Sequence, residues 1–303
     1  MSLKVGIIPE HFSTPLRFAS EKGFFKNNGL DVELIEYPSG SGHLIQSLQK
    51  NEIDIAIGLT EAFVRGLCDG EDSYYISGTY VESPLCWAIS TGSQRDDLNS
   101  KDQLQGMKIG VSRIGSGSYV MSFVLALQEN FKKSYDAGYF EKFPILNNFK
   151  NLRDSVNAVD GVEASDAFMW EHFTSKKYYD NLEIKKIGEI YTPWSSWVIV
   201  PHRNLDKSTI SKFSNAVQQG IQYYLENKQE AANYIANNLD YSLQDAKEWQ
   251  NTVIFSNDVS KIDVEKNIQN TKKILKTAGV IQTNGESDLL IQERLNAGVL
   301  NLK

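Results

Sequence analysis

Short apolar runs alternate with amphipathic segments through the first two thirds of the chain. The apolar runs are rich in Val and Ile, which is typical of strands buried in an α/β sheet. They predict strands at 5–8, 30–35, 53–57, 75–79, 85–90, 107–112, 143–146, 166–169, 184–190 and 197–200. Most of the intervening segments carry apolar residues three or four positions apart and predict helices. This alternation predicts an α/β fold with right-handed crossovers between parallel strands.

The pattern changes after residue 205, where no further strand is predicted. Residues 208–226 place Ile210, Phe213, Val217 and Ile221 at spacings of three to four, which predicts one long amphipathic helix. Further helices are predicted at about 229–237, 242–251, 264–278 and 287–296. The C-terminal third is therefore expected to be helical.

A polar loop at 113–118 joins a predicted strand to a predicted helix, and it contains four candidate ligand-binding residues. These are Arg113, Ser116, Gly117 and Ser118. Free backbone N–H groups and the positive end of the helix dipole favour an anionic or strongly polar group at such a loop. Alternatively, the loop is an ordinary turn in which Ser116 or Ser118 caps the helix, and Arg113 pairs with a neighbouring acid.

Other candidate residues follow strands whose carboxyl ends meet at one side of an α/β sheet, where ligands bind. They are Glu10, His11, Phe12, Ser39, Ser41, Thr60, Glu61, Ser83, Trp170, Glu171, Trp194 and Ser195. Carboxylates and aromatic faces suit a hydrogen-bond-donating or cationic part of a ligand, such as an aminopyrimidine-like ring. The alternative is that the acids are solvated at loop tips.

Composition narrows the class of partner. The 303 residues carry a net charge of −7 without a basic run, which argues against nucleic acid as the main partner. No apolar run approaches the roughly 20 residues of a membrane span. The chain begins with a strand-like segment rather than an export signal, so a cytoplasmic location with two reduced cysteines, Cys68 and Cys86, is expected. A monomer is also expected.

Few residues suggest a metal site or a catalytic centre. The four histidines show no close spacing, so neither a metal nor a cofactor is predicted, although His11 with Glu61 or Glu171 is an alternative metal site. The sequence lacks a nucleophile elbow, a phosphate-binding P-loop and a dinucleotide fingerprint. No catalytic residue is therefore proposed.

The order of these parts resembles the type II periplasmic substrate-binding-protein fold, in its nitrate/sulfonate/taurine and thiamine-pyrimidine group. The resemblance is carried by KVGIIPEHFSTPLRFASEKGFFKNNGLDVEL at 4–34, LIQSLQKNEIDIAIG at 44–58 and LQGMKIGVSRIGS at 104–116. It covers nearly the whole chain, with 168–171 and 197–200 at the later strands. Within the group, the chain is most similar to a fungal and bacterial branch whose fungal members lack export signals.

The resemblance implies two α/β lobes with a ligand cleft between them. Residues 1–89 plus 197–303 would form lobe one and 90–196 lobe two, with 85–90 and 197–200 as the crossing strands. The lobes would close over a small polar or zwitterionic ligand by a hinge motion. An aminopyrimidine-like or amino/sulfonate compound is the expected class.

An enzyme on the same fold, acting on a small heterocycle, is the alternative. The fungal synthase of the thiamine pyrimidine is implied to use a lysine, a histidine and a cysteine cluster. This sequence has Gly58 and Ser13 at the first two positions, and Cys68 and Cys86 are isolated. The sequence therefore favours binding over catalysis.

Overall fold

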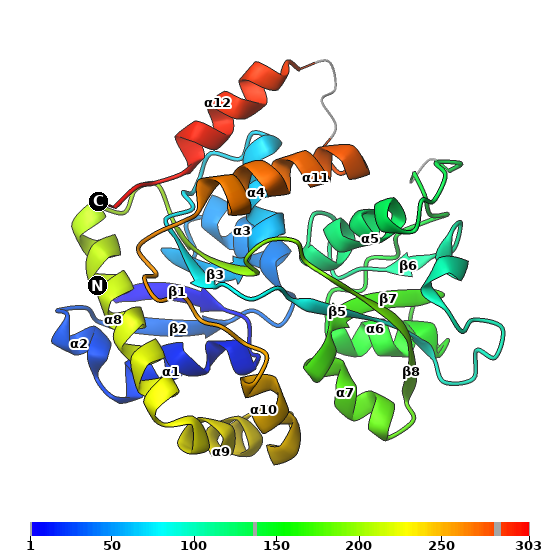
Figure 1. The fold of residues 1–303 in the computed structure, drawn as a ribbon, viewed down its shortest axis with the longest axis horizontal. Coiled ribbons are helices and arrows are strands. Elements are labelled where there is room, and N and C mark those ends of the chain that lie inside the picture. The colour runs from blue at the N-terminus through cyan, green and yellow to red at the C-terminus, as the bar shows by residue number, and fades with distance from the viewer. Residues whose placement is uncertain (1, 136–137, 282–285, 303) are drawn as a thin grey trace.

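The computed structural model describes residues 2–135, 138–281 and 286–302 and arranges them around two β-sheets (Figure 1). Within this part of the chain, the first sheet has five strands in the order β2-β1-β3-β9-β4, and the second has four in the order β6-β7-β5-β8. The first sheet contains β1 (Leu3–Ile7), β2 (Val32–Glu36), β3 (Ile55–Leu59), β4 (Gly78–Val81) and β9 (Trp197–Pro201). The second contains β5 (Cys86–Gly92), β6 (Ile109–Gly110), β7 (Ala167–Glu171) and β8 (Ile184–Tyr191). The α/β class predicted from the sequence is confirmed.

Apolar runs form the centre of the first sheet. All five residues of β3 are buried, and β3 lies between β1, in parallel register, and β9, in antiparallel register. The edge strand β2 is only half-buried and alternates with acidic residues, as its sequence pattern predicts. The parallel arrangement of β1, β2 and β3 brings their carboxyl ends to one edge of the sheet.

The second sheet is mixed. β6 runs parallel to β7, whereas β5 is antiparallel to both β7 and β8. The prediction of a strand at 143–146 is wrong, since the chain there makes only isolated bridges, from Lys142 to Lys108 and from Ile145 to Val111. Trp170 and Glu171, predicted to lie in a loop, are the last two residues of β7.

Helices cover both sheets (Figure 1). α8 packs against α1 and α2 on one side of the first sheet, and α11 and α12 pack against α4 on the other. α11 also packs against α5, so the C-terminal helices touch both halves of the molecule. The helices are α1 (Thr14–Glu21), α2 (Phe24–Asn27), α3 (Ser41–Gln49), α4 (Thr60–Cys68), α5 (Gly117–Gln128), α6 (Phe149–Val156), α7 (His172–Asp180), α8 (Lys207–Glu226), α9 (Lys228–Asn238), α10 (Leu243–Gln250), α11 (Asn270–Ala278) and α12 (Asp288–Gly298).

Three short helical turns complete the secondary structure of the described residues. They are 3₁₀ helices at His11–Ser13 and Lys101–Leu104 and a π-helix at Glu265–Gln269. Ser100 and Gln103 form the capping box that the sequence predicts at the second of these turns. There the Gln103 side chain accepts a hydrogen bond from the Ser100 N–H at 2.9 Å.

Two short segments, 82–85 and 192–196, carry the chain between the sheets. The prediction that 85–90 crosses between the halves needs correction, because β5 pairs with β8 from Cys86 to Gly92 and belongs to the second sheet along its whole length. The expected lobe boundary at residue 89 therefore falls inside a strand. The two segments are bonded to each other, since the Ser196 hydroxyl donates to the Ser83 carbonyl at 2.7 Å and the Leu85 N–H donates to Thr192 Oγ1 at 2.9 Å.

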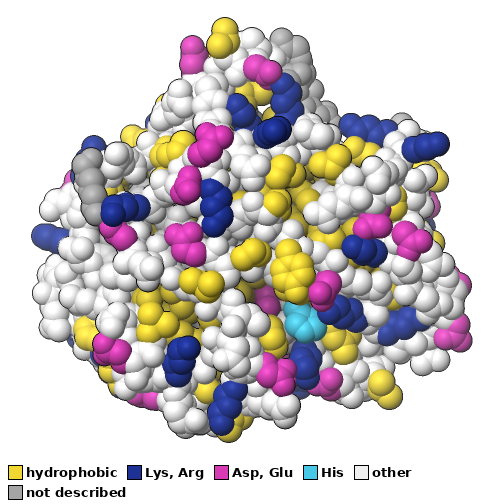
Figure 2. All heavy atoms as spheres, in the orientation of Figure 1, with side chains coloured by type: hydrophobic (Ala, Val, Ile, Leu, Met, Phe, Trp, Pro, Cys, Tyr) yellow, Lys and Arg dark blue, Asp and Glu magenta, His cyan; other side chains and the backbone are white. Residues whose placement is uncertain are grey.

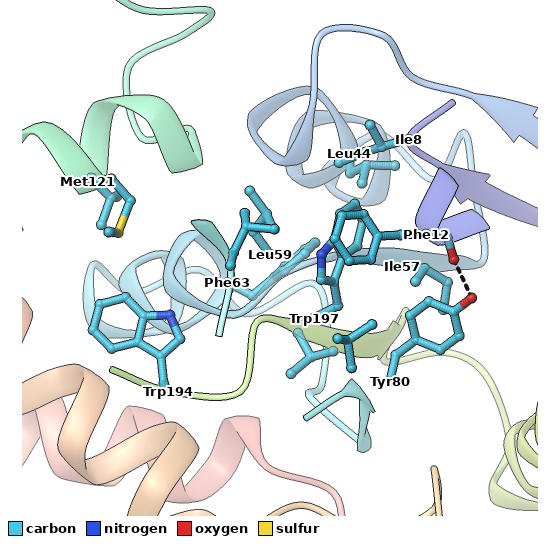
Figure 3. Close-up of a cluster of buried hydrophobic side chains, with 14 of the residues drawn as sticks. Ile8, Phe12, Leu44, Ile57, Leu59, Phe63, Tyr80, Met121, Trp194 and Trp197 are labelled. Atoms are coloured by element: carbon cyan, nitrogen blue, oxygen red, sulfur yellow. Dashed lines mark hydrogen bonds between the residues drawn. The ribbon is translucent and has the colours of Figure 1, made fainter. Parts of the chain in front are cut away.

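The face drawn in Figure 2 mixes acidic, basic and apolar side chains. Among the described residues, no helix has the length and apolar character needed to cross a membrane. Side chains from both sheets join one large buried apolar cluster, part of which is drawn in Figure 3. Tyr80 is tied to it by a hydrogen bond from its hydroxyl to the Phe12 carbonyl at 2.6 Å.

Candidate functional site

A small cavity lies between the two sheets, where loops from both halves meet. Its walls come from the ends of β1, β3 and β7, from the first turns of α3 and α5, and from three tryptophans. The lining residues are Ile8, Glu10, Gly40, Ser41, Leu59, Leu85, Trp87, Ser112, Ser116, Gly117, Ser118, Trp170, Glu171 and Trp197. This position between two α/β halves is where the sequence predicts a ligand cleft.

One wall of the cavity is acidic. Trp170 at the end of β7 donates its indole N–H to Glu10 Oε1 at 3.0 Å, a bond that joins the two halves. Burial raises the pKa of Glu10 to about 8, and the negative charge of Glu171 adds to this effect. Glu10 in this arrangement is therefore mostly protonated at neutral pH, and a cationic group in the cavity would favour its ionised form.

Glu171, beside Glu10, is held in its ionised form. Burial by itself would raise the pKa of Glu171, but the neighbouring His11 and hydrogen bonds from the start of α7 bring it below its ordinary value. The carboxylate accepts hydrogen bonds from Thr174 N at 2.7 Å and from Thr174 Oγ1 at 3.0 Å, and so caps α7. Its charge is thus fixed at the edge of the cavity.

His11 lies behind this acidic wall and does not line the cavity. Its ring is fully buried and stacks between Tyr241 and Trp249, with ring centroids 4.5 and 4.2 Å away. His11 Nε2 is 3.4 Å from Glu171 Oε2. His11 therefore acts on the cavity through the position and charge of Glu171.

The opposite wall presents hydrogen-bond donors. α3 begins at Ser41 and α5 begins at Gly117 after the cap Ser116, so the first turns of two helices border one cavity. The first backbone N–H groups of a helix have no partner within the helix, and its dipole is positive at this end. The hydroxyls of Ser116 and Ser118 lie 3.0 Å apart beside them. This wall suits an anionic or acceptor-rich group.

Two indole N–H groups add to the donors. Trp87 on β5 and Trp197 on β9 both line the cavity, and the Nε1 atom of each is buried without a hydrogen-bond partner. Phe12 lies against Trp197 with ring centroids 5.0 Å apart, as Figure 3 shows. Buried donors without partners are uncommon in folded proteins, so these two N–H groups are available to a ligand.

The two halves are closed on each other in this structure. A Cβ atom on Gly117 of the second half would lie only 2.5 Å from Leu59 Cδ1 of the first. Outside the cavity, Lys176 Nζ on α7 of the second half lies 2.9 Å from Asp245 Oδ1 on α10 of the first. The free space left in the cavity is about 30 Å³, which holds one or two water molecules.

Glu61 occupies a different place from the one the sequence suggests. It is fully buried in the first turn of α4, where Oε2 accepts the Trp194 indole N–H at 2.9 Å and Oε1 has no partner. Burial raises the pKa of Glu61 to about 7. In Figure 3, Trp194 lies on the left of the cluster and Phe12 on the right. Glu61 and Trp194 thus connect α4 to a crossing segment rather than facing the cavity.

The predicted site residues divide into two sets. Those that line the cavity are Glu10, Ser41, Ser116, Gly117, Ser118, Trp170 and Glu171. Those placed elsewhere are His11, Phe12, Ser39, Thr60, Glu61, Ser83, Arg113, Trp194 and Ser195. Several of the second set stabilise the crossings: the Thr60 hydroxyl donates to the Ser195 carbonyl at 2.5 Å, and the Ser195 hydroxyl donates to Glu82 at 2.8 Å.

Sequence reasoning missed Trp87 and Trp197. Each is a tryptophan in an otherwise small or β-branched strand next to a crossing segment, and this change in side-chain size was the available signal. Phe12 and Ser83, by contrast, line a second cavity of about 290 Å³ beside the crossing segment 82–85, which we call the outer cavity. Leu85 and Glu171 line both cavities.

Two α/β halves, two crossing segments and a cavity between them define a protein with the periplasmic-binding-protein type of fold. Two family profiles match the chain: the Ca3427-like PBP over residues 87–190 and the NMT1-like family over residues 1–73. The conserved Candida albicans CA3427 gene product, which defines a family with the generic periplasmic binding protein fold, is 54% identical. The match covers 99% of this chain and 96% of that one, with a TM-score of 0.92. The chain belongs to the CA3427 family.

More distant structures share the fold. The alkanesulfonate-binding protein SsuA from Xanthomonas axonopodis pv. citri, bound to MOPS, is 12% identical with a TM-score of 0.74, and 97% of each chain is covered. The periplasmic aliphatic sulphonate-binding protein SsuA from Escherichia coli is 11% identical with a TM-score of 0.63, covering 99% of this chain and 92% of that one. No curated protein matches the chain. The resemblance to this group predicted from the sequence is confirmed.

Proposed function

We propose that this protein binds a small zwitterion, with an amine at one end and a sulfonate or carboxylate at the other, by closing its two halves over it. One observation carries the proposal: a single cavity has acids on one wall, Glu10 and Glu171, and two helix N-termini with serine hydroxyls on the other. A ligand with one kind of charge would satisfy only one of these walls.

The acidic wall selects the amine. Burial raises the pKa of Glu10 to about 8. An ammonium group between Glu10 and Glu171 would favour the ionised form of Glu10 and would form charge-assisted hydrogen bonds with both carboxylates. Binding at pH 7 therefore releases a proton from the protein. This linkage gives the proposal a signature that a neutral ligand would lack.

The donor wall selects the anion. The first turns of α3 and α5 supply backbone N–H groups, and the indole N–H groups of Trp87 and Trp197 are buried without partners. A sulfonate or carboxylate offers enough acceptor oxygens to use several of them together. MOPS, the molecule bound to the Xanthomonas SsuA, carries both an amine and a sulfonate, which supports this pairing of groups.

Closure follows from the size of the cavity. Its free space of about 30 Å³ is too small for an amino sulfonate, so binding requires an open form. Polar contacts that must break when the halves separate include Trp170 to Glu10, Lys176 to Asp245, and Thr174 to Tyr241 at 2.8 Å between hydroxyls. Asp240 also pairs with Lys177 and accepts a hydrogen bond from the Tyr178 hydroxyl. A ligand that replaces these contacts with its own favours the closed form.

The heterocycle-processing enzyme gains no support. At Gly58, where that chemistry would place a lysine, a Cβ atom would lie 2.7 Å from Phe63 Cε2 and 2.9 Å from Ser41 Oγ. Packing on β3 therefore leaves no room for a lysine side chain. Binding without turnover is the function we propose.

Isothermal titration calorimetry with protein stripped of ligand by unfolding and refolding tests the proposal. We expect taurine or a short amino acid to bind at least tenfold more tightly than ethanesulfonate or ethylamine alone, and to be recovered unchanged. Glu10→Gln should remove the proton release and most of the affinity, whereas the exposed Glu33→Gln should change neither. Binding of simple anions alone, or of an aminopyrimidine but no zwitterion, would contradict it.

A further inference from the structure

A second group of chemically reactive side chains lies beside the crossing segment 82–85. Cys86 at the start of β5, His172 at the start of α7 and Glu189 near the end of β8 come together there. One ligand atom from each, the sulfur, a ring nitrogen and a carboxylate oxygen, lies within 4.8 Å of the others. These residues are far apart in the sequence, so spacing alone gave no sign of the group.

The distances suit a metal ion. Zinc–sulfur and zinc–oxygen bonds of about 2.3 and 2.1 Å at a tetrahedral angle place sulfur and oxygen roughly 3.6 Å apart. Cys86 Sγ and Glu189 Oε2 are 3.6 Å apart. A small adjustment of the His172 ring would complete three of the four positions of a tetrahedron.

The site is open to solvent and to a cavity. All three residues are half-buried, and all three line the outer cavity of about 290 Å³. A metal held by three protein ligands beside such a space keeps its fourth position for water or a small ligand. Structural zinc sites, by contrast, have four protein ligands.

Lys186 now occupies the position of the cation. Its Nζ lies 3.4 Å from His172 Nδ1, and it forms an ion pair with Glu189 Oε2. Its side chain is about 30% exposed and can turn toward solvent. A metal ion that binds here must displace this ammonium group, so removal of Lys186 should favour the metal.

A thiolate and a neutral imidazole are the forms of cysteine and histidine that ligate a metal ion. Metal binding then forms the metal–sulfur bond and releases the thiol proton to solvent.

We propose that Cys86, His172 and Glu189 form a binding site for a divalent transition-metal ion of the zinc class, with one coordination position open to the outer cavity. The mixed set of thiolate, imidazole and carboxylate is typical of zinc and cobalt(II) rather than of magnesium or calcium, which prefer oxygen ligands. Leu85 and Glu171 line both cavities, but none of the three proposed metal ligands lines the cavity proposed for the zwitterion, so either proposal stands without the other.

Cobalt(II) titration of the full chain, reduced and freed of metal by a chelator, tests the site. We expect one cobalt ion per chain, a thiolate-to-cobalt charge-transfer band in the near ultraviolet, and displacement of cobalt by zinc. Affinity should rise with pH, and calorimetry in two buffers of different ionisation enthalpy should report the released proton.

Variants separate a ligand role from a structural one. Cys86→Ser should abolish the band, His172→Ala and Glu189→Gln should each weaken cobalt binding at least tenfold, and Lys186→Met should strengthen it several-fold. Cys68→Ser is the matched control, because Cys68 is the other free cysteine, is fully buried, and should leave the band intact. Thermal unfolding without metal checks that each variant folds. A band that persists in Cys86→Ser, or the absence of any band in the wild-type protein, would overturn the proposal.

Discussion

The buried carboxyl of Glu61 makes the stability of this protein depend on pH in a specific way. Its ordinary pKa is 4.5, and burial raises it to about 7 in the folded protein. The folded protein therefore binds this proton more tightly than the unfolded chain does. The resulting contribution to the free energy of unfolding is fully present below pH 4.5 and is lost as the pH rises through 7. The difference, at about 1.4 kcal/mol per pH unit, is about 3 kcal/mol of unfolding free energy.

Glu61→Gln removes the titration and retains an acceptor for the Trp194 indole N–H, which now bonds to Oε2 at 2.9 Å. We expect the wild-type protein to lose about 3 kcal/mol more than the variant between pH 5 and pH 9. Glu10 titrates in both proteins, so its contribution cancels in the comparison. Urea denaturation at several pH values, with the dependence on urea concentration compared between variants, provides the measurement.

Glu33→Gln, on the exposed face of β2, removes the same charge without removing a buried group. It should follow the wild-type curve. If the Glu61→Gln and wild-type curves stay parallel from pH 5 to pH 9, the buried carboxyl is not the source of the linkage and the argument fails.

Two further substitutions test closure of the cleft. Trp170→Phe leaves the Glu10 carboxyl buried without its hydrogen-bond donor, which should destabilise the closed form by about 1–3 kcal/mol. The population of open molecules seen by small-angle scattering should then increase, and an unchanged scattering profile would contradict this. Gly117→Ala places a Cβ atom 2.5 Å from Leu59 Cδ1 across the cleft and should weaken ligand binding about tenfold or more. Gly42→Ala, whose nearest contact across the same interface would be 3.4 Å, should change affinity by less than twofold.

The sequence predicted the fold well because the sheets depend on local patterns. The run predicted at 53–57 overlaps the central strand β3, which spans Ile55–Leu59, and the periodicity of 208–226 falls within α8. The prediction of a strand at 143–146 was wrong because a short apolar run does not reveal whether a neighbouring strand is long enough to pair with it. The neighbouring strand β6 has only two residues.

The site was harder to predict than the fold. Strand ends indicate which loops approach the cleft, but not which side chain of a loop points inward: Glu10 lines the cavity, whereas Glu61 points toward Trp194. Trp87 and Trp197 were missed because a tryptophan in an apolar run is equally typical of a core. The cytoplasmic location and the monomeric state stay predictions from the sequence, and the boundary predicted at residue 89 lies inside β5.

The order of strands in the first sheet also determines how the protein can be made. β9 lies between β3 and β4, yet its residues follow the whole second sheet in the sequence. A nascent chain that ends before residue 197 exposes the edge of β3, an apolar strand with unpaired N–H and C=O groups that invites aggregation. The first half is thus translated early but can be completed only after the second half has left the ribosome, and a chaperone that shields β3 in that interval would raise the yield of folded protein.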